Sequence, residues 1–119
     1  MILIIGGAYQ GKLQYVKEKY KVSDDEIFEC SSEAEIDLSK RVFHHFEYYL
    51  KHCLDCGKSP VLDFNDDQIV IMNDIFCGVV PIEKDLRALR EYCGRAGAEL
   101  TKKAEHVTRI FCGLPQELK

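Results

Sequence analysis

The sequence has no long hydrophobic run, no basic stripe and no second closely spaced cysteine pair, and each absence excludes a class of protein. Its most apolar stretch, residues 1–5, ends directly in glycines and has no basic leader before it. That is too short for a membrane span, and it lacks the parts of a secretion signal. We therefore expect a cytoplasmic protein with no membrane partner.

The balance of charge argues against nucleic acid as a partner. The chain has 16 basic and 20 acidic residues, a formal net charge of −4, and no clustered basic surface of the kind that follows a phosphate backbone. It also shows no internal repeat and no low-complexity linker. A length of 119 residues, 46% of them hydrophobic, suffices for one compact core. We expect a single domain, 1–119.

Six cysteines are present, and in a reducing compartment we expect free thiols. Cys53 and Cys56 form a C-x-x-C pair, but a four-ligand zinc site needs more ligands at a familiar spacing. The pair also falls at the end of a predicted helix, not at the N-terminus, where a thiolate is stabilised. We therefore assign it no metal or redox role. Cys77, Cys93 and Cys112 lie in apolar segments, where we expect them to pack as small hydrophobic residues.

Strand and helix patterns alternate along the chain. Strands are predicted at residues 1–5, 26–30, 68–72 and 107–112, and helices at residues 11–20, 33–56 and 83–104. The long middle helix rests on Ile36, Phe43, Phe46 and Leu50, which recur at helical spacing. Alternation of this kind predicts an α/β fold, a three-layer sandwich with a mostly parallel sheet.

The most specific motif runs from Gly6 to Lys12, reads GGAYQGK, and is called the glycine loop below. It follows a predicted strand, precedes a helix and has the spacing of a phosphate-binding loop. Backbone amides of Gly6, Gly7, Ala8 and Gly11 would hold phosphates, and Lys12 would reach the outer ones. We predict a P-loop NTPase-like domain that binds ATP or GTP. The alternative is an ordinary turn between strand and helix.

One position departs from the phosphate-loop pattern and directs attention to an acid later in the chain. Leu13 stands where Ser or Thr normally holds Mg²⁺, so binding is better supported than catalysis. Asp74 follows a predicted buried strand at the same sheet edge, where it could hold Mg²⁺ or accept a proton from an alcohol. Lys12 and Asp74 are our candidate catalytic residues, and Asp74 is the candidate metal ligand. The alternative is that Asp74 only caps a turn.

Three arginines are candidates for binding a phosphorylated substrate. Arg87, Arg90 and Arg95 lie on the predicted helix at 83–104, which begins soon after Asp74. Guanidinium groups bind phosphate through two parallel hydrogen bonds. The alternative is that each is an ordinary surface charge.

Two adjacent histidines invite a catalytic or metal-binding interpretation. His44 and His45 fall inside the predicted helix at 33–56, where His44 lies opposite the apolar stripe and His45 lies at its margin. A solvated helix face explains both positions, so we assign them no function.

The motifs together resemble those of the adenosylcobinamide kinase / adenosylcobinamide-phosphate guanylyltransferase family of cobalamin biosynthesis. The resemblance rests on the glycine loop and on residues 73–81, NDIFCGVVP, where the family typically has Asn-Glu-Val-Gly-x-Gly-Ile-Val-Pro. It continues through the spacing of the arginines and through Ala104 and Val107. The resemblance covers the start of the chain and its C-terminal part.

The resemblance implies a P-loop α/β fold, a homotrimer, and phosphorylation of the cobinamide hydroxyl by ATP or GTP. It further implies GMP transfer through a guanylyl-histidine, and it places Asp74 where the family has glutamate. Leu13, Phe76 and Gly97 depart from the family pattern, and the region that carries the guanylylated histidine is missing. We therefore expect phosphoryl transfer without guanylyl transfer. A non-catalytic nucleotide-binding or regulatory homologue, and an assembly domain with a relic loop, are the alternatives.

Overall fold

The structure, a computed structural model, describes residues 1–74 and 83–119. Expectations for Phe76 and Cys77 concern residues outside that part. The elements in chain order are β1 (Ile2–Gly6), α1 (Lys12–Tyr20), a 3-10 turn (Asp24–Glu26), β2 (Ile27–Glu29), β3 (Val42–His44), α2 (Phe46–Cys56), β4 (Ile69–Asn73), α3 (Lys84–Lys103), β5 (His106–Phe111) and β6 (Leu114–Glu117).

The six strands form one sheet in the order β2-β3-β4-β1-β5-β6. All neighbouring strands are parallel except β6, which runs antiparallel to β5. β1 lies in the middle, between β4 and β5. Successive side chains of a strand point to opposite faces, and both Leu3 and Ile4 of β1 are buried. The uninterrupted apolar sequence of β1 therefore reflects a sheet covered on both sides, and the predicted α/β fold with a mostly parallel sheet is confirmed.

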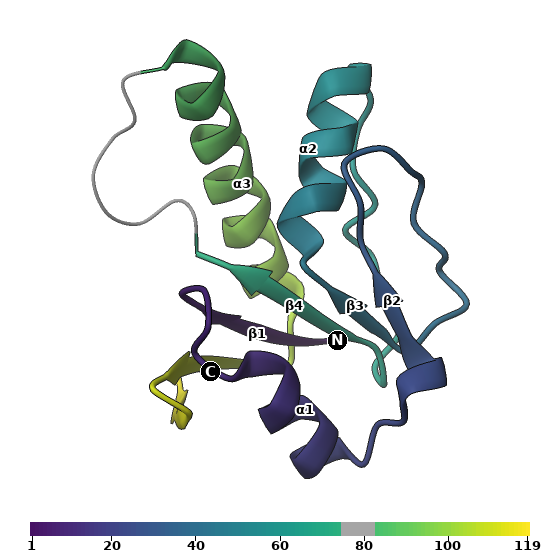
Figure 1. Cartoon of the computed structure of the whole chain (residues 1–119), viewed down its shortest axis with the longest axis vertical. Coiled ribbons are helices and arrows are strands. Elements are labelled where there is room, and N and C mark those ends of the chain that lie inside the picture. The colour runs from purple at the N-terminus through teal and green to yellow at the C-terminus, as the bar shows by residue number, and fades with distance from the viewer. Residues whose placement is uncertain (75–82) are drawn as a thin grey trace.

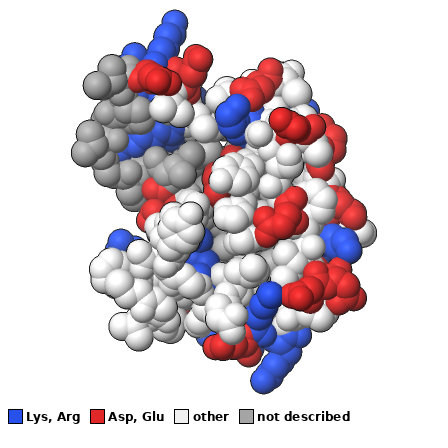
Figure 2. Space-filling view, in the orientation of Figure 1, with Lys and Arg blue, Asp and Glu red and all other residues white. Residues whose placement is uncertain are grey.

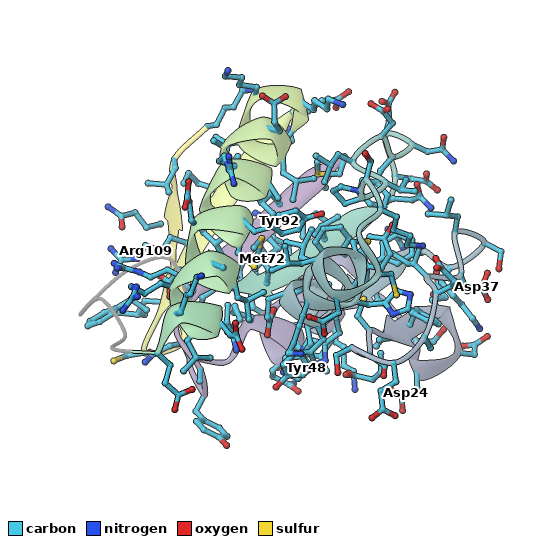
Figure 3. The ribbon with its side chains drawn as sticks, turned by 90° about the horizontal axis from the view of Figure 1, so that it is seen from above. Asp24, Asp37, Tyr48, Met72, Tyr92 and Arg109 are labelled. Carbon is cyan, nitrogen blue, oxygen red and sulfur yellow. The ribbon has the colours of Figure 1, made fainter. Side chains whose placement is uncertain are left out.

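Helices cover the two faces of the sheet unequally. α1 lies on one side, and α2 and α3 lie together on the other (Figure 1). Val16 of α1 packs against Ile4 and Ile71 in one apolar cluster. The other cluster lies under α2 and α3 and includes Met72, which Figure 3 shows between these two helices together with Tyr92. The arrangement is compatible with the predicted three-layer sandwich.

The predicted helix at 33–56 is wrong in its first half. Val42–His44 forms the short strand β3, and α2 begins only at Phe46. His45, in the left-handed conformation with φ 55°, separates the two elements. The helical spacing was misleading because Phe43, on the strand, and Phe46, on the helix, pack into the same apolar cluster.

The C-terminal end of the chain contains a strand that the sequence patterns missed. Cys112 and Gly113 both have positive φ, 51° and 77°, as a two-residue hairpin turn requires. They connect β5 to the exposed edge strand β6. Cys112 is therefore exposed in a turn, which corrects its predicted place in the core, whereas Cys93 is buried as expected.

The carboxyl ends of the parallel strands bring polar groups to one edge of the sheet. The last residues of β1, β2, β3 and β4 are Gly6, Glu29, His44 and Asn73. In open parallel sheets, this edge is where ligands bind. The glycine loop leaves β1 at the same edge.

Candidate functional site

The glycine loop begins where two strand backbones approach each other closely. A Cβ atom added to Gly6 would lie 2.5 Å from the carbonyl oxygen of Ile110, in β5. Further along the loop, Tyr9 and Gly11 adopt left-handed conformations, with φ of 59° and 87°. Glycine at position 6 is therefore required for strand packing, and glycine at position 11 is favoured by the turn that starts α1.

Hydrogen bonds hold the glycine loop from two sides. The amide of Gly113, in the β5–β6 hairpin, donates to the carbonyl oxygen of Gln10 over 2.9 Å, and the amide of Cys112 donates to the Gln10 side chain. On the other side, the amide of Asp74 donates to the carbonyl oxygen of Gly6 over 3.1 Å. The missed hairpin thus helps to position the loop.

Lys12 is buried inside the loop. Its residue exposure is 5%, and its Nζ donates to the carbonyl oxygen of Gly7 over 2.6 Å. Burial lowers the pKa of Lys12, and the negative charges of Glu47 and Asp74 partly oppose that shift. Ala8 and Tyr9 form a turn beside Lys12. The loop therefore combines a buried cation with a tight turn of backbone, an environment that an anion would complete.

A pocket of about 420 Å³ opens beside Lys12. It is lined by Ala8, Tyr9, Gln10, Gly11, Lys12, His44, His45, Tyr48 and Asn73. Of the predicted nucleotide-binding residues, Ala8, Gly11 and Lys12 line this pocket, whereas Gly6 contacts β5 and Gly7 accepts the lysine hydrogen bond. The volume is within the range of small-molecule sites.

The two histidines belong to this pocket, contrary to the prediction of a solvated helix face. His44 ends β3 and His45 precedes α2, so neither lies on a helix. Both contact Glu29: Nδ1 of His45 lies 3.0 Å from Oε2, and Nδ1 of His44 contacts Oε1. Burial lowers the pKa of His44, against the opposing effect of Glu29. Burial would raise the pKa of Glu29, but its hydrogen bonds with both histidines outweigh burial and lower it.

Glu47 is a buried carboxylate that the sequence analysis did not single out. It is 3% exposed, and its Oε1 accepts a hydrogen bond of 3.0 Å from the amide of Asn73. Its Oε2 has no partner among the described residues. A second pocket of about 290 Å³, lined by Glu47, Tyr48, Lys51, Asn73, Leu86, Leu89 and Arg90, shares Tyr48 and Asn73 with the first. Its one sequence signal is an acid in the first turn of a helix, and that signal requires the helix to begin at Phe46, not at residue 33.

The three arginines predicted to bind a phosphorylated substrate lie in different surroundings. Arg90 is half-buried and lines the second pocket, whereas Arg87 is exposed on the first turns of α3. Arg95 lies 3.7 Å from Glu91 with its side chain 73% exposed, and it borders a different hollow beside Pro60. Arg90 is thus the arginine of this set that the described structure places next to the site.

Asp74 lies directly after β4, beside the end of β1. Its negative charge opposes the lowering of the Lys12 pKa. Asp74 therefore lies close to the glycine loop, as a metal ligand or a proton acceptor must. The C-x-x-C pair lies at the far end of α2, where Cys53 is buried and Cys56 is exposed. All five described cysteines are free thiols.

Charge on the visible face follows no single pattern. Blue and red side chains are interspersed in Figure 2, and no continuous blue stripe crosses the described residues on this face. Among the described residues, no helix combines the length and the apolar character that crossing a membrane requires.

The chain matches no protein-family model and no curated protein. The residues of the site therefore carry the functional argument.

Proposed function

We propose that this chain binds ATP or GTP through a P-loop-like glycine loop and transfers a phosphoryl group to an alcohol. The observation that carries this proposal is the buried ammonium of Lys12 beside a pocket lined by the loop itself. The resemblance to the adenosylcobinamide kinase family suggests the cobinamide hydroxyl as acceptor and a homotrimer as the assembly.

A polyphosphate is the ligand class that best matches these groups. Lys12 is removed from water, yet its hydrogen-bond acceptor is the neutral carbonyl of Gly7. A phosphate oxygen would give the ammonium a charged partner, and charge-assisted hydrogen bonds are about twice as strong as neutral ones. The amides of the glycine loop would supply further donors to the same anion.

The remaining roles follow from position. Asp74 is the proposed ligand of nucleotide-bound Mg²⁺, acting directly or through water, because it follows β4 directly and its amide donates to Gly6, where the glycine loop begins. Arg90 and Glu47 line the adjoining pocket, which suits a phosphorylated or hydroxylated acceptor. Glu47, with one buried oxygen lacking a partner, is a second candidate to receive the alcohol proton. Arg87 and Arg95 contribute to this proposal only through the resemblance.

One observation favours a second candidate function, a nucleotide-binding or regulatory protein without turnover. Leu13, at the position of the missing hydroxyl, packs against the apolar cluster beneath α1. The position is therefore used for packing. Metal-dependent chemistry would have to proceed without a ligand from it.

Calorimetry with GTP and with ATP, each with Mg²⁺, tests nucleotide binding. Lys12→Ala should weaken binding at least about tenfold, since it removes a charged hydrogen-bond donor. Lys17→Ala is the matched control: Lys17 lies on the same helix but pairs with Asp24 over 2.8 Å. Equal affinity of the wild type and Lys12→Ala would refute the proposal. Phosphorylation of cobinamide by the wild type would then distinguish the kinase from the non-catalytic alternative.

A further inference from the structure

We propose that Glu29, His44 and His45 form a binding site for a divalent transition-metal ion of the zinc and cobalt class, in the wall of the pocket beside Lys12. Each residue offers a ligand atom, and these atoms all lie within 4.8 Å of one another. His44 and His45 also line the pocket itself. The proposal goes beyond nucleotide binding and needs no nucleotide.

The fold brings the three residues together from two strands and a helix start. β2 and β3 pair in parallel so that Glu29 lies directly beside His44. The left-handed backbone of His45 turns the chain back, and the two imidazole rings lie 3.8 Å apart between centroids. A left-handed backbone is strained for a residue that carries a Cβ atom. Strained residues of this kind concentrate at functional sites.

The spacing requires only a small adjustment to hold a metal. Two bonds of about 2.1 Å at a tetrahedral angle place their ligand atoms about 3.4 Å apart. Nδ1 of His45 and Oε2 of Glu29, 3.0 Å apart, are already near that value. No two ligand atoms of the cluster are more than 4.8 Å apart, so no separation has to shorten by more than about 1.4 Å. Movement of the half-exposed His45 and exposed Glu29 side chains can supply this.

The donor set selects the class of metal. Imidazole nitrogen favours zinc, cobalt, nickel and copper, whereas Mg²⁺ prefers oxygen ligands and keeps its waters. Two histidines and one carboxylate form the three-ligand set of many catalytic zinc sites, which leave a position open for water or substrate. Because both histidines line the pocket, that position would be accessible from it. The site therefore differs in chemistry from a nucleotide-bound Mg²⁺ near Asp74.

The test is a titration of the tag-free, reduced full chain with Co²⁺. The visible ligand-field absorption of the bound Co²⁺ measures binding, and Zn²⁺ is then added to displace the Co²⁺. We expect one equivalent to bind. His45→Ala and Glu29→Gln should each weaken binding at least about tenfold, since loss of even an outer-shell partner costs 10- to 100-fold. Glu29→Gln keeps the size of an exposed side chain, and thermal unfolding of each variant would verify that it folds.

A control variant separates this site from other metal-binding groups. His52→Ala removes a histidine whose Nδ1 lies 3.9 Å from the sulfur of Cys56, and it should leave Co²⁺ binding unchanged. The titration contains no nucleotide, so its result does not depend on whether the glycine loop binds one, which separates failure of this inference from failure of nucleotide binding. Strong sulfur-to-cobalt charge-transfer bands, or equal affinities of the wild type and His45→Ala, would overturn the proposal.

Discussion

Replacing each glycine of the glycine loop with alanine, one at a time, should destabilise the protein to very different degrees, although all three glycines belong to the same motif. A methyl group at position 6 would lie 2.5 Å from the carbonyl oxygen of Ile110, so the backbones of β1 and β5 would have to separate. Overpacking costs typically 1–3 kcal/mol. Because a backbone atom is the obstacle here, we expect Gly6→Ala to cost about 3 kcal/mol, at the upper end of that range.

The other two glycines have space for a methyl group. At Gly11, the nearest atom is Cα of Gly113 at 3.7 Å, but φ is 87°, and a left-handed backbone costs alanine about 1–2 kcal/mol. At Gly7, the nearest atoms belong to the flexible Gln10 side chain, at 3.7 and 3.9 Å. Gly7→Ala should therefore change the free energy of unfolding by no more than about 0.5 kcal/mol.

Urea denaturation of the three variants and the wild type measures these differences directly. The midpoints should fall in the order Gly7→Ala, Gly11→Ala and Gly6→Ala, from the highest to the lowest, with unchanged denaturant dependence. For a domain of this size, about 3 kcal/mol corresponds to a melting temperature lower by roughly 10 °C. If Gly6→Ala were no more destabilising than Gly7→Ala, the close approach of β1 and β5 would be refuted.

The same series separates folding from ligand binding. Gly7→Ala is expected to fold normally, so any loss of GTP affinity in this variant would come from the loop and its ligand. Gly6→Ala cannot give this information, because its defect lies in the contact between strands.

The central strands and the outer helices were predictable because each pattern there has one cause. β1 and β4 are buried on both faces, so their sequences are apolar without interruption, and α1 and α3 were placed within one or two residues. The glycine loop was locatable for the same reason, since a glycine-rich segment between strand and helix has few alternatives. The packing role of Gly6 could not be predicted, because Ile110, whose carbonyl oxygen leaves no space for a side chain at position 6, is far away in the sequence.

The prediction for residues 33–56 was wrong because residues of a strand and of a helix pack into the same apolar cluster, and their spacing in the sequence matches that of a single helix. Val42–His44 is too short to show strand alternation, and Phe43 reaches the same cluster as the helical residues Phe46 and Leu50. The error displaced His44 from the site to a helix surface. The sequence offered a signal against the helix, since Asp37 and Ser39 can bond each other locally, and the Ser39 amide does donate to Asp37 over 3.0 Å. Local bonds of this type favour turns.

Two further predictions concern thiol reactivity and the missing hydroxyl. Burial raises the pKa of Cys30 and of Cys93 to about 12, so at pH 8 these thiols should stay protonated and react with iodoacetamide much more slowly than the exposed Cys56 and Cys112. Peptide mass spectrometry over time measures this order, and equal rates would contradict the burial. Leu13→Ser should restore a hydroxyl ligand beside the phosphates and strengthen Mg²⁺-dependent GTP binding about tenfold. Leu13→Ala is the matched control, because it loses the same packing against the apolar cluster but supplies no oxygen. Calorimetry with and without Mg²⁺ compares the two variants, and an identical metal dependence would show that position 13 does not face the nucleotide-bound ion.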